Sequence, residues 1–413
     1  MNLTHLNPIA ALERLKNVIK RTPLIYNDRL SEKYSCEIYL KREDLQVVRS
    51  YKLRGAYNMI SQLNAEELSK GVVCASAGNH AQGVAFSCRK LNTRGVIFMP
   101  ENTPRQKISQ TRMFGDSVIE IILVGDTFDD CLREALAYTK ANNMTFIPPF
   151  DNYKIIEGQG TVGVEILQDL PDADIVIVPV GGGGLAAGAG SYLKQVNPEV
   201  KIIGVEPEGA PSMLTALQSG APVTLQEINR FVDGASVKRA GEITFPICRQ
   251  VLDEVALVPE GKVCTTILKL YNEDAIVAEP AGALSIAALD FFTDKIRGKK
   301  VVCIVSGGNN DIERMQEIKE RSLLYEGLKH YFVISFPQRP GALKTFVNHV
   351  LGTGDDITRF EFIKKTNRES GPALVGIELK SSDDYPALLQ KMNDYKFDYK
   401  EINKDQTLFE YLV

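Results

Sequence analysis

Residues 174–188 read DIVIVPVGGGGLAAG, an apolar run that leads directly into four glycines and a segment of small residues. An apolar run bounded by glycines predicts a buried strand that is followed by a loop and a helix. A glycine loop at the start of a helix presents free backbone N–H groups at the positive end of the helix dipole, which suits a phosphate dianion. Ordering four consecutive glycines is entropically costly, and an ordinary turn does not need so many. The stretch therefore predicts a phosphate-binding loop. Its residues are Gly181, Gly182, Gly183, Gly184 and Leu185.

The same glycines allow a second interpretation. Gly181, Gly183 and Ala186 fit the dinucleotide-binding pattern G-x-G-x-x-G/A, and Glu206 ends the next predicted strand, as that pattern requires. On this segment alone an NAD-dependent oxidoreductase stays open, and other parts of the chain have to discriminate between the two.

Apolar strand-like runs alternate with longer amphipathic segments over most of the sequence. Short apolar strands separated by helices are typical of parallel sheets that are buried on both faces. The pattern predicts an α/β fold, in which ligands bind at the carboxyl ends of the strands. We expect strands over residues 71–76, 94–100, 118–124, 175–180, 201–206 and 300–306, and helices over residues 53–63, 81–91, 103–114, 127–142 and 185–196.

The composition excludes several classes of protein. The chain has 413 residues, of which 44% are hydrophobic and 24% are charged, and its formal net charge is -4. This is an ordinary globular composition, and it gives no electrostatic reason to expect nucleic acid or an anionic membrane as a partner. No apolar run approaches the roughly 20 residues of a membrane span, and the N-terminal segment lacks the pattern of a secretory signal.

The metal-binding and redox residues are sparse. The seven cysteines are scattered without C-x-x-C spacing, and the four histidines show no paired spacing. We therefore expect buried thiols in a reducing compartment, no metal site and a cytoplasmic location.

Three further segments supply groups that complement the phosphate loop. SYKLRGA (residues 50–56) contains Lys52, CASAGNH (residues 74–80) follows a predicted strand and opens a helix, and VSGGN (residues 305–309) follows another strand. Taken singly, they are explained as a surface lysine, a helix N-cap and a turn. Together with the glycine loop they match a pyridoxal-phosphate site, in which a lysine forms the Schiff base and small polar groups address the ring and the substrate.

These four segments occur in the order and spacing of a known family. From about residue 21, where RTPL begins, to residue 310, the chain closely resembles the threonine dehydratases of the tryptophan-synthase-β-like fold. The resemblance implies a pyridoxal-phosphate enzyme of fold type II with two parallel-sheet subdomains, the smaller over about residues 53–150. It argues against the dinucleotide interpretation of the glycine loop.

The resemblance also implies a role for each residue of the motifs. Lys52 would be the Schiff-base lysine and the catalytic base, and Asn79 would hydrogen-bond the ring hydroxyl. The loop from Gly181 to Gly184, with Leu185, would bind the phosphate, and Ser306 would face the pyridine nitrogen. The substrate carboxylate would be held by Ser76, Ala77, Gly78, Asn79 and His80.

The implied reaction is deamination of L-threonine by β-elimination of water, which gives 2-oxobutanoate and ammonia in the first step of isoleucine biosynthesis. A neutral Ser306 cannot hold a proton on the ring nitrogen as a carboxylate would, which favours quick elimination. Ala77 stands where serine racemases of this fold have a second base, and Ser212 stands where their metal site has an aspartate. We therefore expect neither racemisation nor a metal. Glu279 also matches the dehydratases, with its role left open.

The pattern of elements changes after residue 310. A charged helical segment over residues 312–324 leads into a β-α-β-β-α-β order, which is the ferredoxin-like pattern. The turn FPQRPGAL (residues 336–343) resembles that of an ACT-like amino-acid-binding domain. We expect a catalytic domain over residues 1–321 and an ACT-like regulatory domain over residues 322–413. The expected strands are residues 330–336, 356–364, 372–380 and about 408–413, and the expected helices are residues 340–351 and 384–393.

The resemblance implies isoleucine as an allosteric effector and a homodimer or homotetramer as the assembly. Two alternative functions stay open. L-Serine dehydratase activity is one, because serine and threonine differ by a methyl group that a pocket discriminates only weakly. A non-catalytic amino-acid sensor is the other.

Overall fold

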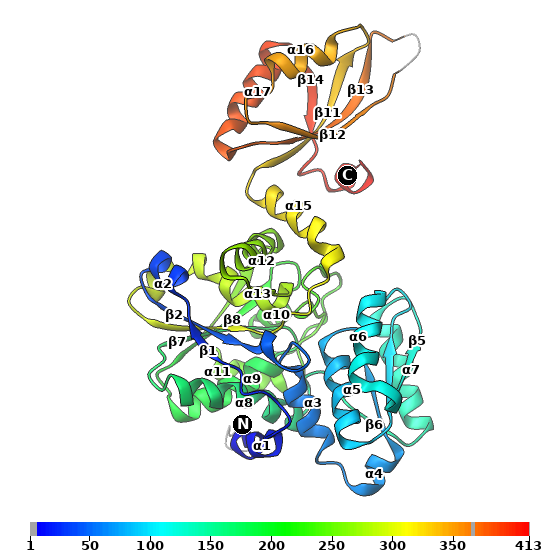
Figure 1. Cartoon of the computed structure of the whole chain (residues 1–413), viewed down its shortest axis with the longest axis vertical. Coiled ribbons are helices and arrows are strands. Elements are labelled where there is room, and N and C mark those ends of the chain that lie inside the picture. Colours follow the sequence, from blue (N-terminus) through cyan, green and yellow to red (C-terminus); the bar gives the residue numbers. More distant parts are fainter. Residues whose placement is uncertain (1–5, 365–367, 413) are drawn as a thin grey trace. The chain divides into compact units, whose positions relative to one another are not determined.

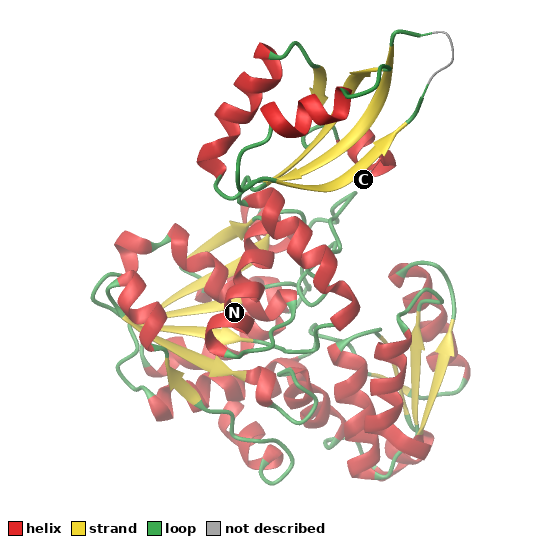
Figure 2. Cartoon of the chain, turned by 45° about the horizontal axis from the view of Figure 1, so that its top comes forward, coloured by secondary structure: helices red, strands yellow, loops and turns green. Residues whose placement is uncertain are grey.

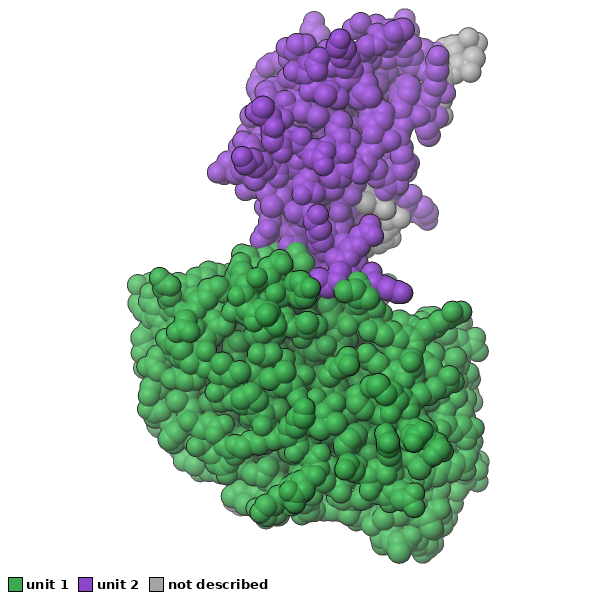
Figure 3. Space-filling view, viewed as in Figure 1, with its two compact units in different colours: residues 1–312 green, residues 313–413 purple. Residues whose placement is uncertain are grey.

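The computed structural model describes residues 6–364 and 368–412. The chain divides into two compact units, residues 1–312 and residues 313–413 (Figure 3). The expected boundary at residue 322 separates a catalytic domain from a regulatory domain, and it stays a prediction. In the described ranges, we find no helix long and apolar enough to cross a membrane.

The larger sheet of unit 1 has the strand order β1-β2-β10-β7-β8-β9 within the described residues (Figure 1). All neighbouring strands are parallel except β1, which pairs antiparallel with β2 at the edge. The strands β7, β8 and β10 were predicted, whereas the short β1, the charged β2 and the half-buried β9 were not. The bounds are β1 (Leu24–Tyr26), β2 (Glu37–Arg42), β7 (Ile175–Pro179), β8 (Lys201–Pro207), β9 (Glu254–Val258) and β10 (Lys300–Val305).

The smaller sheet of unit 1 has the order β5-β4-β3-β6, and all of its described pairings are parallel. Its side chains alternate between two covering layers: Val72 and Cys74 pack with α5, whereas Val73 and Ala75 pack with α7. This burial on both faces explains why the strands read as continuous apolar runs. The bounds are β3 (Val72–Ala75), β4 (Gly95–Met99), β5 (Ile119–Leu123) and β6 (Thr145–Phe146).

Helices cover both faces of each parallel sheet (Figure 2). On the larger sheet, α8, α9 and α11 form one layer, and α12 and α13 lie on the opposite face (Figure 1). The bounds are α1 (Pro8–Leu15), α2 (Asp28–Tyr34), α3 (Lys52–Ile60), α4 (Ala65–Lys70), α5 (Asn79–Leu91), α6 (Arg105–Gly115), α7 (Phe128–Ala141), α8 (Tyr153–Asp169), α9 (Gly184–Val196), α10 (Ser212–Ser219), α11 (Thr244–Val251), α12 (Glu260–Asp274), α13 (Pro280–Ala287) and α14 (Thr293–Ile296).

Unit 2 begins with α15 and continues with the predicted β-α-β-β-α-β order, which the described residues confirm, although its last strand lies earlier in the chain than predicted. The sheet order is β12-β13-β11-β14, with all neighbours antiparallel. A cluster of aromatic rings from Phe336, Phe346 and Phe397 joins the sheet to its helices. The bounds are α15 (Met315–Tyr325), β11 (Lys329–Pro337), α16 (Ala342–His349), β12 (Asp356–Phe362), β13 (Ser370–Glu378), α17 (Tyr385–Asp394), β14 (Asp398–Glu401) and α18 (Gln406–Leu412).

The predicted terminal strand over residues 408–413 is wrong. The last strand is β14, and residues 408–412 belong to the helix α18; Val413 lies outside the described residues. The Asp405 carboxylate accepts a hydrogen bond from the Leu408 N–H at 3.1 Å, which caps the start of this helix. Leu408 and Phe409 then pack beside Tyr331, so their apolar character serves a helix face and not a strand.

Candidate active site

The sequence motifs converge on one pocket at the carboxyl ends of β7 and β10, where an open α/β sheet places its ligands. Tyr51 and Ser306 meet there, because the Tyr51 N–H donates to the Ser306 carbonyl at 3.2 Å. The pocket is lined by Tyr51, Lys52, Asn79, Pro179, Gly181, Gly234, Ala235, Glu279, Ala281 and Ser306.

Lys52 is the first residue of α3, and its ammonium donates to the Pro149 carbonyl oxygen at 3.1 Å. Desolvation lowers the pKa of this amine to about 8, although the Glu279 carboxylate acts in the opposite direction. A partly buried amine with such a pKa is a usable nucleophile and base near neutral pH.

The glycine loop follows β7 and leads into α9. Gly183 has φ = 91°, in the left-handed region that favours glycine. A Cβ added to Gly182 would lie 2.4 Å from the Phe150 ring, and one added to Gly181 would lie 2.8 Å from the Ala235 carbonyl oxygen. The loop therefore stays free of side chains and presents its backbone at the N-terminus of α9, as an anion requires. Gly184 and Leu185 form the first turn of that helix.

The Asn79 amide is held from two sides. Its Nδ2 donates to Glu279 Oε1 at 2.6 Å, and its Oδ1 accepts from Asn309 Nδ2 at 2.7 Å. These bonds fix which end of the amide faces Glu279. Burial raises the pKa of Glu279 to about 7, and the neighbouring charge of Asp233 adds to the rise. Asn309 was not singled out from the sequence; its place in the VSGGN segment was the available signal.

The segment from Ser76 to His80 turns from β3 into α5 at the rim of the pocket. Ser76 Oγ accepts from the Gly78 N–H at 3.2 Å, and a Cβ on Gly78 would meet nothing within 4 Å, so Ala77 and Gly78 leave open space. The His80 ring is buried and its Nε2 lies 2.8 Å from the Ile147 carbonyl oxygen. Desolvation, with the charge of Lys52, lowers the pKa of His80 to about 3, so the neutral ring donates to that carbonyl. This side chain anchors the segment.

Glu206, the acidic residue that the dinucleotide-binding pattern requires, has a structural explanation. Its carboxylate accepts from the Met213 N–H at 2.7 Å and the Leu214 N–H at 2.8 Å, and thus caps the N-terminus of α10. The described residues contain no group of three or more His, Cys, Asp or Glu side chains placed to hold a metal ion.

Comparison with known proteins assigns both units of the chain. The family described as "Pyridoxal-phosphate dependent enzyme" matches residues 15–307, and the "C-terminal regulatory domain of Threonine dehydratase" matches residues 320–412. The "L-threonine dehydratase biosynthetic IlvA" of Halalkalibacterium halodurans is 59% identical over 406 residues, which cover 98% of each chain. The chain belongs to the biosynthetic threonine dehydratases. The protein of that name from Bacillus subtilis is also 59% identical, over 98% of this chain and 96% of its own.

The solved structures agree with this membership. The processed form of threonine deaminase isoform 2 from Solanum lycopersicum is 41% identical, with a TM-score of 0.73, and the match covers 76% of this chain and 93% of that one. The predicted fold type and family are confirmed, and the dinucleotide interpretation of the glycine loop is wrong.

Membership of this family makes pyridoxal phosphate the cofactor of the chain. The pocket fits it on three observations made above: an amine with a lowered pKa, a glycine loop in which a Cβ has no room, and an amide whose orientation is fixed. These supply a covalent attachment point, a phosphate cradle and a hydrogen-bond partner for the ring.

Proposed function

We propose that this chain deaminates L-threonine to 2-oxobutanoate and ammonia, and that the pocket around Lys52 performs the reaction. The observation that carries the proposal is the convergence of Lys52, Asn79, Ser306 and the glycine loop on one pocket. The identity of 59% over nearly the whole chain to a protein named for this activity supports threonine as the substrate.

The proposed roles follow from the position of each group. Lys52 holds the cofactor covalently, and the N–H groups of the loop from Gly181 to Leu185 bind its phosphate. Asn79 donates to the ring hydroxyl, and Ser306 faces the ring nitrogen. The substrate carboxylate is held by the segment of Ser76, Ala77, Gly78, Asn79 and His80, through the backbone of this turn at the N-terminus of α5.

The bound cofactor supplies an electron sink that acidifies the Cα proton of the substrate. Desolvation lowers the pKa of the Lys52 amine to about 8, so this amine, when free, would be suited to accept the proton near neutral pH. The Ser306 hydroxyl is neutral and does not hold a proton on the ring nitrogen as a carboxylate would. This weakens the sink and favours prompt loss of the β-hydroxyl.

The direct test measures keto-acid release from L-threonine and from L-serine by the purified protein. We expect 2-oxobutanoate from threonine in preference to pyruvate from serine, and no turnover by Lys52→Ala. A preference for serine would establish the serine dehydratase alternative. A protein that releases neither keto acid and binds no cofactor would leave the sensor alternative.

We further propose that unit 2 binds isoleucine and that the bound amino acid inhibits the catalytic site. The match to the regulatory domain supports an effector site in this unit. A cavity of about 280 Å³ lies between the loop before β12 and α17. Lys380, Lys391, Asp355 and Asp384 give its wall both signs of charge, and Val350 and Leu388 add apolar surface. An aliphatic amino acid needs both kinds of partner.

Lys391→Gln tests this site. Neither Lys380 nor Lys391 forms an ion pair with any residue in the described ranges, so their charges are available to a carboxylate. Loss of one such charged partner is expected to raise the isoleucine concentration for half-inhibition about tenfold or more. Lys344→Gln, an exposed lysine on α16 outside the cavity, is the matched control. Equal inhibition of both variants and the parent would place the effector elsewhere.

We propose a homo-oligomer that works in the cytoplasm. The edge strand β12 ends in the exposed Phe362, which is followed by the exposed Ile363. The unpaired backbone groups of an edge strand and these two apolar side chains favour pairing with a second copy. All seven cysteines are free and buried, as in a reducing compartment. Light scattering of the purified chain measures the assembly; a monomer would contradict the proposal.

A further inference from the structure

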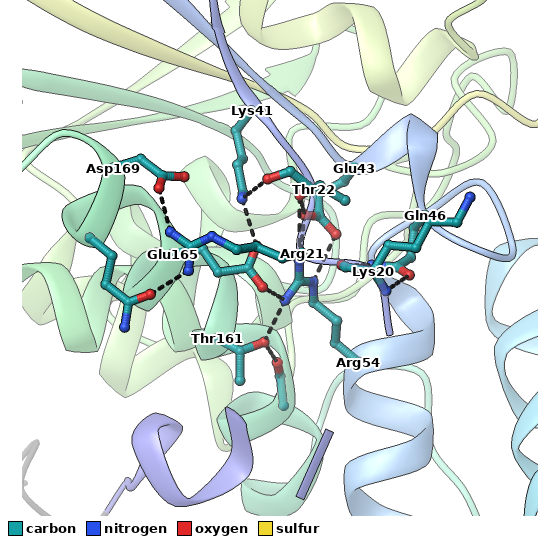
Figure 4. A network of polar contacts seen from close by, with 12 residues as sticks. Lys20, Arg21, Thr22, Lys41, Glu43, Gln46, Arg54, Thr161, Glu165 and Asp169 are labelled. Carbon is teal, nitrogen blue, oxygen red and sulfur yellow. Dashed lines mark hydrogen bonds and ion pairs between the residues drawn. The ribbon is translucent and has the colours of Figure 1, made fainter. Parts of the chain in front are cut away.

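Four buried charged side chains, one of them from α3, are joined to one another by ion pairs (Figure 4). The members are Arg54, Glu43, Lys41 and Glu165, and we call them the Arg54 cluster. Each of these side chains is at most 1% exposed, and the two positive and two negative charges balance. The reaction proposed above uses none of them.

Arg54 joins the two carboxylates through paired hydrogen bonds. Its Nε and Nη2 donate to Glu43 at 2.8 Å each, and its Nη1 and Nη2 donate to Glu165 at 2.7 and 2.8 Å. Nη1 also donates to Thr161 Oγ1 at 3.0 Å. Two bidentate pairs on one planar guanidinium fix both position and orientation, which a lysine cannot do.

Lys41 completes the cluster from β2. Its ammonium donates to Glu165 Oε2 and to the Thr22 carbonyl oxygen, both at 2.6 Å. The positive charges of Arg54 and Lys41 lower the pKa of Glu165 despite its burial, so the carboxylate stays ionised. The cluster thereby connects the first turn of α3 with β2, the 3-10 turn Glu43–Leu45 and α8.

The place of Arg54 on α3 gives the cluster a relation to Lys52. Two residues along an α-helix rotate the side chain by about 200°, so Lys52 and Arg54 leave the same turn on nearly opposite sides. The amine points toward the pocket lining, and the guanidinium points into the cluster. A displacement of the guanidinium therefore moves the turn that presents the amine.

The helix α8 packs against both α3 and α9, the helix that follows the glycine loop, and neither contact leaves room for a methyl group. A Cβ on Gly158 of α8 would lie 2.4 Å from the Arg54 carbonyl oxygen, and one on Gly188 of α9 would lie 2.2 Å from the Ile156 carbonyl oxygen. A Cβ on Gly163 would lie 2.7 Å from the Ala189 carbonyl oxygen. Close-packed backbones transmit displacements with little loss. The helix α8 is thus a rigid spacer between α3 and α9.

We infer that Arg54 is a positioning residue that sets the distance between the Lys52 amine and the phosphate-binding glycines through α8. This inference rests on the proposed roles of Lys52 and the glycine loop. A buried ionic cluster adds little stability over apolar side chains of similar volume, whereas its directional bonds specify one geometry. The cofactor is attached at both ends of this distance, so an error in it displaces the reacting atoms.

Arg54→Lys tests the inference, because it keeps the positive charge and removes the two bidentate hydrogen-bond pairs of the guanidinium. We expect kcat per bound cofactor to fall about tenfold or more, with a small change in KM for threonine. The pH dependence of the absorption of the bound cofactor should shift as well, because the amine is held differently. A purely structural role would lower the fraction of folded protein and leave both of these readouts unchanged.

Two further variants keep the test decisive if Arg54→Lys does not fold. Thr161→Val removes one acceptor of Arg54 without stranding a charge, and it should lower kcat in the same direction by a smaller factor. Thr266→Val is its matched control: a buried threonine on α12 whose hydroxyl donates to the Lys262 carbonyl. The double variant Lys41→Met/Glu165→Gln removes one positive and one negative charge, so Arg54 and Glu43 still balance each other. We expect this variant to fold and to have a lower kcat than the parent chain.

The outcomes separate this inference from the proposed function. Absence of threonine turnover in the unsubstituted chain would overturn the proposed function itself. An active parent whose Arg54→Lys and double variants match it in kcat and in the pH dependence of cofactor absorption would overturn the positioning role alone.

Discussion

The site consists of ordinary side chains whose properties are changed by their surroundings. Lys52 loses much of its basicity through desolvation, and Glu279 gains proton affinity for the same reason. Desolvation disfavours the charged form in both cases, so it moves the two pKa values toward each other, to about 8 and about 7. The pocket thereby holds an amine and a carboxyl group that both titrate near neutral pH.

A pH measurement on the cofactor-free chain tests the environment of Lys52. Only the unprotonated amine attacks an aldehyde, so the rate of covalent pyridoxal-phosphate uptake should rise with pH and level off above about 8. An unperturbed lysine would level off only above about 10.4. Uptake is followed by absorbance, and Lys52→Ala should show no covalent uptake. A rate that still climbs through pH 10 would contradict the lowered pKa.

At the level of single elements, the loop between β7 and α9 combines a left-handed backbone conformation with tightly packed surroundings. Gly183 holds a positive φ, and a Cβ there would lie 2.7 Å from the Met213 methyl carbon and 3.0 Å from Thr244 Oγ1. The loop geometry therefore depends on the absence of a side chain at Gly183 and on the close packing of Met213 in α10 and Thr244 in α11.

Gly183→Ala should lower the free energy of unfolding by about 1–2 kcal/mol from backbone strain alone, and it should also weaken cofactor binding. Gly220→Ala is a matched control, because Gly220 also has positive φ but a Cβ there meets nothing within 4 Å. Chemical denaturation and cofactor titration of both variants separate the two effects. Unchanged cofactor affinity in Gly183→Ala would show that the loop tolerates a side chain.

At the level of the whole molecule, catalysis and regulation are assigned to different units. The pocket around Lys52 lies within residues 1–312, and the cavity beside α17 lies within residues 313–413. Coupling between two such sites amounts to about 1–3 kcal/mol in typical allosteric proteins. The helix α15, which begins at Met315, belongs to unit 2, although the expected boundary at residue 322 cuts through it.

Two truncated chains test the division. A chain that ends at residue 321 should deaminate threonine and lose its response to isoleucine, as should one that ends at residue 312 if α15 serves only unit 2. Initial rates with and without isoleucine, together with circular dichroism, provide the comparison. Isoleucine sensitivity that survives the truncation would place the regulatory site in the catalytic unit.

Much of this structure could be predicted because its signals are local. The strand, glycines and helix start of residues 174–188 are contiguous, and the segments of Asn79 and Ser306 each follow a strand that an apolar run indicates. Lys52 opens α3 without such a strand before it. The strands β7 and β10 are neighbours in one parallel sheet, so the glycine loop and Ser306 meet at its edge. The segment of Asn79 follows β3 of the other sheet, and the packing of the two sheets brings it to the pocket. The terminal helix α18 was mistaken for a strand because a short apolar run has no decisive periodicity.

The local motifs of the sequence thus determined the fold type and the family, and they predicted Lys52, Asn79, Gly181 and Ser306 of the pocket lining. Only the tertiary structure revealed the partners of those motifs. Asn79 meets Glu279 from 200 residues away, and Lys41 meets Glu165 from 124 residues away. From the sequence, Lys41 in the charged strand β2 would be taken for a surface residue, whereas in the structure it is buried against Glu165 of α8. Such pairings depend on which elements become neighbours in the fold, and the periodicity of the sequence reports only local structure.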